Sequence, residues 1–110
     1  MDYVICMPAA SSIPLPAARA LRKLGEDLAL ARRKRGISTE DMAARLFVTR
    51  ATLHRLEKGD PRVAIGTVAT AAFVLQLIDR LANVAAPETD ALALSLDEER
   101  VPKRIRRPRG

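Results

Sequence analysis

The sequence predicts an all-α protein: a bundle of five helices with a flexible or short-strand extension at each end. Three observations support this fold class. Apolar residues recur at helical spacing in several segments. Alanine supplies much of the 48% hydrophobic content, and only three of the 110 residues are aromatic. Because β-sandwiches draw more heavily on aromatic and β-branched residues, closely packed helices are favoured.

The first helix is expected from about residue 16 to residue 35. Proline fits the first turn of a helix, as Pro16 would, and Gly36 is typical of the residue that ends one. The buried stripe is predicted at helical spacing and consists of Ala17, Leu21, Leu24, Leu28 and Ala31. Residues 1–16 contain three prolines, so they form an extension rather than one continuous helix, with residues 3–6 as a candidate short strand.

Two short helices with a tight turn between them are expected next. Ser38 is predicted to cap a helix that runs to about residue 46, because its hydroxyl can accept from a free N–H of the first turn. Phe47 and Val48 form the turn, and Thr49 is predicted to cap a third helix that extends to about residue 58. Such a pair of helices can place its second member in the major groove of DNA.

Two more helices are expected, over about residues 65–75 and 77–84, so that residues 17–86 form one helix-turn-helix domain. Their apolar stripe is larger than the core of one chain should bury. It consists of Phe73, Val74, Leu77, Ile78, Leu81 and Val84. Part of it is therefore expected at a homodimer interface. The alternative is that all of it packs within one chain.

The remaining residues, 87–110, are expected to form a basic tail. Residues 91–96 could be a strand or a weak helix, and either this segment or residues 3–6 could add a strand between two subunits. Residues 102–110 are predicted to be disordered, because they are basic and contain two prolines.

The net charge of +6 is unevenly distributed. Residues 100–110 carry six bases and no acid, whereas residues 1–99 carry 13 of each. Within that neutral body, residues 32–62 hold nine bases against four acids, and residues 63–99 hold one against six. A basic band beside an acidic flank is the pattern expected of a protein that binds nucleic acid on one side.

Other classes are disfavoured. With one cysteine, Cys6, and one histidine, an internal disulfide is excluded and a zinc site is not expected. No apolar run approaches the ~20 residues that span a bilayer, and the start of the chain is a poor signal peptide. The sequence therefore predicts a cytoplasmic protein without a cofactor, a membrane partner or enzymatic activity.

The string ISTEDMAARLFVTRATLHRLEKGDP, which begins at Ile37, resembles the Cro/cI-type (Xre) helix-turn-helix family, and the resemblance extends over roughly residues 20–77. It implies two sets of DNA contacts. Those to base edges come from Arg50, Ala51 and Arg55, and those to phosphates from Thr39, Thr49, Thr52 and Lys58. The residue types agree with this assignment, because arginine is the usual partner of guanine and helix N-termini attract phosphate.

The same resemblance implies a structural ion pair between Arg32 and Glu57, which would hold the recognition helix to the bundle. His54 also lies on that helix and is expected to touch solvent or phosphate. Two positions depart from the family pattern. Thr39 replaces a common glutamine, and Phe47 replaces a glycine whose left-handed backbone would cost Phe47 about 1 kcal/mol unless its ring packs.

The tail, PETDALALSLDEERVPKRIRRPRG, resembles that of HipB-type antitoxins. This resemblance implies a homodimer that represses its own operon and neutralises a HipA-like kinase toxin. A stand-alone repressor of phage type or of metabolism is the main alternative. An RNA- or nucleoid-binding protein is a third, which the small number of aromatic residues disfavours.

Overall fold

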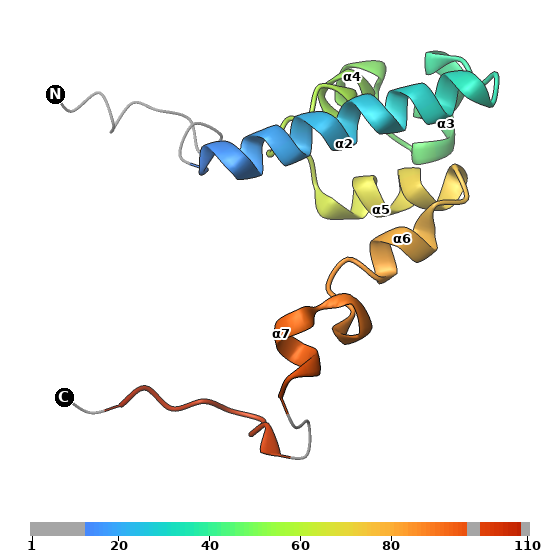
Figure 1. The fold of residues 1–110 in the computed structure, drawn as a ribbon. Helices are drawn as coiled ribbons and strands as arrows, with labels where there is room; N and C mark the ends of the chain where they lie inside the picture. Colours follow the sequence, from blue (N-terminus) through green and yellow to red (C-terminus); the bar gives the residue numbers. More distant parts are fainter. Residues whose placement is uncertain (1–12, 97–99, 109–110) are drawn as a thin grey trace, which may run out of the picture.

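A computed structural model describes residues 13–96 and 100–108, which form helices and no strand (Figure 1). In chain order the elements are α2 (Leu15–Lys34), α3 (Thr39–Leu46), α4 (Arg50–Glu57), α5 (Ile65–Val74), α6 (Ile78–Ala82), the 3-10 helix η2 (Pro87–Thr89) and α7 (Ala91–Leu94). The all-α class is confirmed for the described residues. The five predicted helices correspond to α2–α6, and the described residues contain one further α-helix, α7, where a strand and a weak helix were both open. The candidate strand at residues 3–6 lies outside the described residues.

The buried stripe expected on α2 is only partly correct. Leu28 is buried, and Leu21 and Ala31 are half-buried, but Ala17 and Leu24 are exposed. The first turns of α2, which include Ala17, project beyond the other described helices of the bundle (Figure 1). Leu24 borders an open apolar groove next to α5 and α6.

The C-terminal end of α4 lies directly against α2 at two glycines. A Cβ atom at Gly25 would lie 2.7 Å from the carbonyl oxygens of Leu56 and Glu57, and one at Gly59 would lie 2.5 Å from that of Leu21. Both distances are shorter than Cβ atoms tolerate. Gly59 also has a φ of 77°, a left-handed conformation that glycine adopts without steric cost. The two backbones pack this closely because neither position carries a side chain.

The turn between α3 and α4 places Phe47 in the left-handed region, with φ 57° and ψ 39°. The Phe47 N–H donates to the Ala44 carbonyl at 3.1 Å, and the Val48 N–H donates to the Ala43 carbonyl at 3.1 Å. These two bonds satisfy carbonyls at the end of α3. The ring of Phe47 is 93% exposed, so no packing offsets the backbone strain.

The core lies where α2, α3, α4 and α5 meet. Its largest fully buried side chains are Met42, Leu53 and Leu75, around which Leu28, Leu46, Leu56 and Ala71 pack. α6 packs on α5, whereas η2 and α7 pack on each other. Figure 1 shows these last two elements displaced from the bundle, with residues 100–108 leading farther away. The bundle therefore presents α4 on one side and α5 and α6 on another.

Candidate nucleic-acid interface

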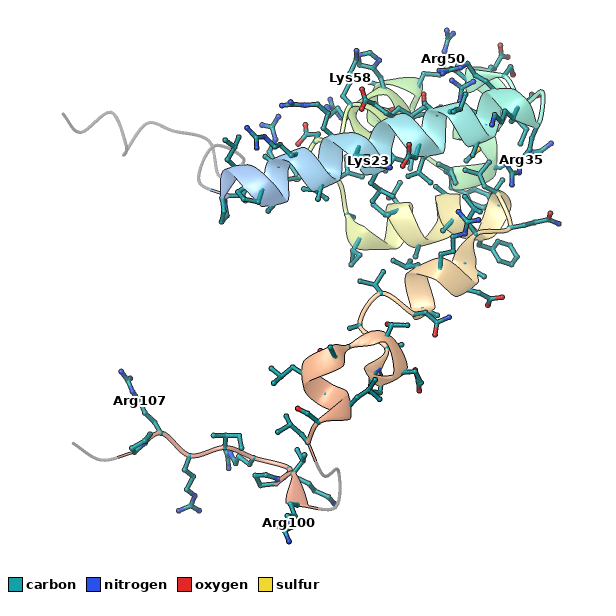
Figure 2. All side chains as sticks on the ribbon, in the orientation of Figure 1. Lys23, Arg35, Arg50, Lys58, Arg100 and Arg107 are labelled. Carbon is teal, nitrogen blue, oxygen red and sulfur yellow. The ribbon has the colours of Figure 1, made fainter. Side chains whose placement is uncertain are left out.

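α4 presents an exposed face opposite its buried residues. Leu53 and Leu56 are 1% and 4% exposed and face the core. At about 100° per residue, Ala51 and Lys58 point nearly the opposite way, and both are exposed. Figure 2 shows Arg50 and Lys58 on the side of the bundle away from α5 and α6. This face is free to approach a partner.

Arg50 occupies the first turn of α4, beside a shallow groove between α3 and α4. Thr39 and Ala51 line the same groove. Thr39 is the first residue of α3, and Thr49 is the N-cap of α4. Free backbone N–H groups at helix N-termini attract anions. The groove therefore lies beside the Arg50 guanidinium and the N-termini of α3 and α4.

Arg55 is held by a short chain of hydroxyl groups. Its Nη1 donates to the Thr52 hydroxyl at 3.5 Å. The Thr49 hydroxyl donates to Thr52 Oγ1 at 3.1 Å and accepts from the Thr52 N–H at 3.1 Å. Thr52 is half-buried, whereas Thr49 and Arg55 are exposed. Thr52 therefore links the N-cap residue of α4 to Arg55.

Lys58 caps the C-terminus of α4, and the chain then turns through Asp60. The Arg62 side chain donates to Asp60 Oδ1 at 3.1 Å and to Asp60 Oδ2 at 3.0 Å. These hydrogen bonds from Arg62 lower the pKa of the Asp60 carboxyl. The carboxylate beside the basic face is therefore neutralised by a partner of its own.

Arg32 and Glu57 form a bidentate ion pair between α2 and the last residue of α4. Arg32 Nε donates to Glu57 Oε2 at 2.7 Å, and Arg32 Nη2 donates to Glu57 Oε1 at 3.2 Å. Arg32 Nη1 donates to the Ile37 carbonyl at 3.0 Å. The two side chains are 9% and 15% exposed. Arg32 therefore joins α2, α4 and the α2–α3 loop at one buried point.

Two parts of this arrangement were missed by the sequence reasoning. The hydrogen bond to the Ile37 carbonyl could not be predicted, because every residue has a backbone carbonyl and the sequence does not indicate which one accepts. Gly25 did have one, since a glycine within a helical pattern suggests that another backbone approaches closely.

Within the described ranges, no cluster of His, Cys, Asp or Glu could hold a metal ion. No helix there is long and apolar enough to cross a membrane. The capped pair α3 and α4, with cations on the outward face of α4, defines the class of DNA-binding helix-turn-helix proteins.

Comparison with protein families gives the same result. Residues 23–92 match the family model of a helix-turn-helix domain, so the chain belongs to this family, which is of the Xre/Cro-like type. The family is one of DNA-binding regulators and is not an enzyme family. No curated protein and no solved structure matches the chain.

Proposed function

We propose that this protein is a sequence-specific transcriptional repressor that binds its operator as a homodimer. The observation that carries the proposal is the outward face of α4, where exposed Ala51, Arg55 and Lys58 lie away from the buried leucines and exposed Arg50 lies at the edge of the face. An α-helix fits the major groove, where arginine can make two hydrogen bonds to guanine. Bound over a promoter, such a protein would block access to it.

Within this proposal the residues divide into two roles. Arg50, Ala51 and Arg55 read base edges, the alanine through contact with a thymine methyl group. Phosphate contacts position the domain without reading sequence. We assign them to Thr39, Thr49, Thr52 and Lys58.

Alanine substitutions separate the two roles. Arg50→Ala and Arg55→Ala should each weaken binding to the preferred site by roughly 1–3 kcal/mol and relax the preference at particular positions. Lys58→Ala should weaken binding to all sequences alike and lower the salt slope by about one unit. The measurements are site selection from random duplexes and binding isotherms at several salt concentrations. Unchanged affinity in both arginine variants would refute this assignment of the recognition surface.

The homodimer is supported by apolar surface on α5, α6 and the residues after α6. Phe73 is 68% exposed and Val84 is 74% exposed. Val84 also belongs to an apolar groove, which is lined mainly by Leu24, Leu28, Val68, Ala72, Leu77, Leu81 and Val84. One recognition helix reads too few base pairs for useful specificity, and a second copy on this surface would supply another. Leu81→Asp should yield a monomer in analytical ultracentrifugation, whereas the exposed substitution Glu40→Lys on α3 should not.

We further propose that the repressor is the antitoxin of a HipA-like kinase toxin. Supporting this, the C-terminal part of the chain combines basic residues with exposed Leu92, Leu94, Val101 and Ile105. DNA does not need these apolar groups, but a protein partner would cover them. Deleting residues 100–110 should then reduce capture of the kinase encoded by a neighbouring gene and leave operator binding at high salt nearly unchanged.

A stand-alone repressor predicts a different result for the same deletion, a change in DNA binding instead of kinase capture. Without a toxin, the tail acts only as a DNA arm. Its deletion would remove six positive charges, and affinity would then fall steeply at low salt. If the full-length chain captures no kinase and the tail deletion lowers DNA affinity, the antitoxin proposal is overturned and the repressor remains.

A further inference from the structure

His54 lies nearer the centre of the exposed face of α4 than Arg50 does. At about 100° per residue, its side chain projects within about 60° of Ala51 and about 40° of Lys58. His54 is exposed and borders two grooves. The groove between α3 and α4 also contains Arg50 and Ala51. The other lies between α2 and α4 and contains Lys58. His54 therefore stands among the residues assigned to DNA, on the ridge between both grooves.

We propose that His54 is a base-reading residue and that it binds DNA as the imidazolium ion. This inference rests on the proposed DNA-binding function and adds a specificity-determining residue to it. Both ring nitrogens of an imidazolium donate hydrogen bonds. Guanine presents the acceptors N7 and O6 in the major groove, and one ring N–H can donate to either of them while the other donates to a different acceptor. The cation also gains from the surrounding phosphates, as an uncharged ring would not.

Charged groups of α2 and α4 line the same two grooves as His54. The cations that line these grooves are Arg22 and Arg33 of α2 with Arg50 and Lys58, and the carboxylates are Glu26, Asp27 and Glu57. Two of these carboxylates already have partners, because Glu57 pairs with Arg32 and Asp27 accepts from Lys23 at 2.6 Å. DNA phosphates bring opposite charge to an imidazolium in the complex.

The composition makes the inference testable, because His54 is the single histidine of the chain. Histidine is the side chain that ordinarily changes charge between pH 5 and 8. If binding takes up this proton, affinity should rise about tenfold from pH 8 to pH 5.5 at constant ionic strength. The probe is a duplex selected by the wild-type protein from a random library, and the measurement is fluorescence anisotropy.

Two variants complete the design. His54→Gln keeps a hydrogen-bonding side chain but cannot carry a charge, so its affinity should not depend on pH. It should also change the base preferred at one position of each half-site in a repeated selection. Lys58→Ala is the matched control: it removes a neighbouring cation, weakens binding overall and should keep the pH dependence of the wild type.

Three results would overturn the inference. One is a wild-type affinity that does not change with pH, and another is an equal pH dependence in His54→Gln. The third is a selection by His54→Gln that returns the wild-type site, which would make His54 a phosphate contact at most. A wild-type protein that selects no duplex at all would refute the proposed DNA-binding function itself, a distinct outcome.

Discussion

Replacing Arg32 with alanine should destabilise the bundle far more than the loss of one surface charge would. The variant removes two hydrogen bonds to Glu57 and one to the Ile37 carbonyl. It leaves a carboxylate that is only 15% exposed without its counter-ion. Breaking one side of a buried pair typically costs about 3–5 kcal/mol. Small domains are stabilised by only about 5–15 kcal/mol in total, so the loss should be large.

The assay is thermal and urea unfolding of the free protein. A cost of about 3 kcal/mol corresponds to a fall in Tm of roughly 12–24 °C for a domain of this size. Lys23→Ala is the matched control, since it removes the same charge from α2 but from an exposed pair with Asp27. Exposed pairs contribute little, so the Tm of this control should match that of the parent.

A double variant distinguishes the loss of the ion pair from the cost of leaving one charge buried without a partner. Arg32→Met combined with Glu57→Leu leaves no buried charge, and replacing a buried pair with apolar groups is often neutral or stabilising. It should therefore be more stable than Arg32→Ala. If Arg32→Ala has the same Tm as the parent protein, water solvates the Glu57 carboxylate when Arg32 is absent. In that case the ion pair does not hold α4 in place.

Three more predictions follow from the backbone and from Asp60. Phe47→Gly should raise stability by about 0.5–1 kcal/mol in urea unfolding, because glycine accepts the left-handed turn and the 93% exposed ring gives up no packing. No gain would mean that Phe47 is unstrained. Gly25→Ala should lower it by about 2 kcal/mol or more, since the new methyl group meets backbone atoms at 2.7 Å; equal stability would show that α2 and α4 can separate at no cost. Arg62→Ala should raise the pKa of Asp60 in an NMR titration, because Arg62 hydrogen bonds lower it. The stability linked to this pair is present above the ordinary aspartate pKa of about 3.9 and is lost as pH falls through the lowered value. An unchanged titration would exclude Arg62 as the cause.

The helices could be predicted because local signals agree with the fold. Ser38 caps α3 by accepting from the Asp41 N–H at 3.0 Å, and Thr49 caps α4 in the same way. Both caps depend on residues only three positions apart, so a single sequence contains them. α7 was ambiguous because its four residues are too few to show a helical period.

The burial of α2 could not be predicted in full. A repeat of apolar residues shows that a helix has an apolar face, but not how far the neighbouring helices extend along it. Ala17 is exposed for this reason. Similarly, the family pattern that implied contacts for Arg50 and Arg55 carried no information on the hydroxyl chain through Thr52. That chain depends on rotamers, which the sequence does not encode locally.

The charges of the bundle also determine which side can meet DNA. Residues 32–62, which include α3 and α4, hold nine bases against four acids, and residues 63–99 hold one against six. DNA phosphates attract the first set, whereas α5 carries no charged side chain and α6 carries one acid and one base, Asp79 and Arg80, so α5 and α6 offer a duplex no net attraction. Because the two surfaces do not overlap, a partner protein on α5 and α6 would leave Arg50 and Arg55 available to the operator.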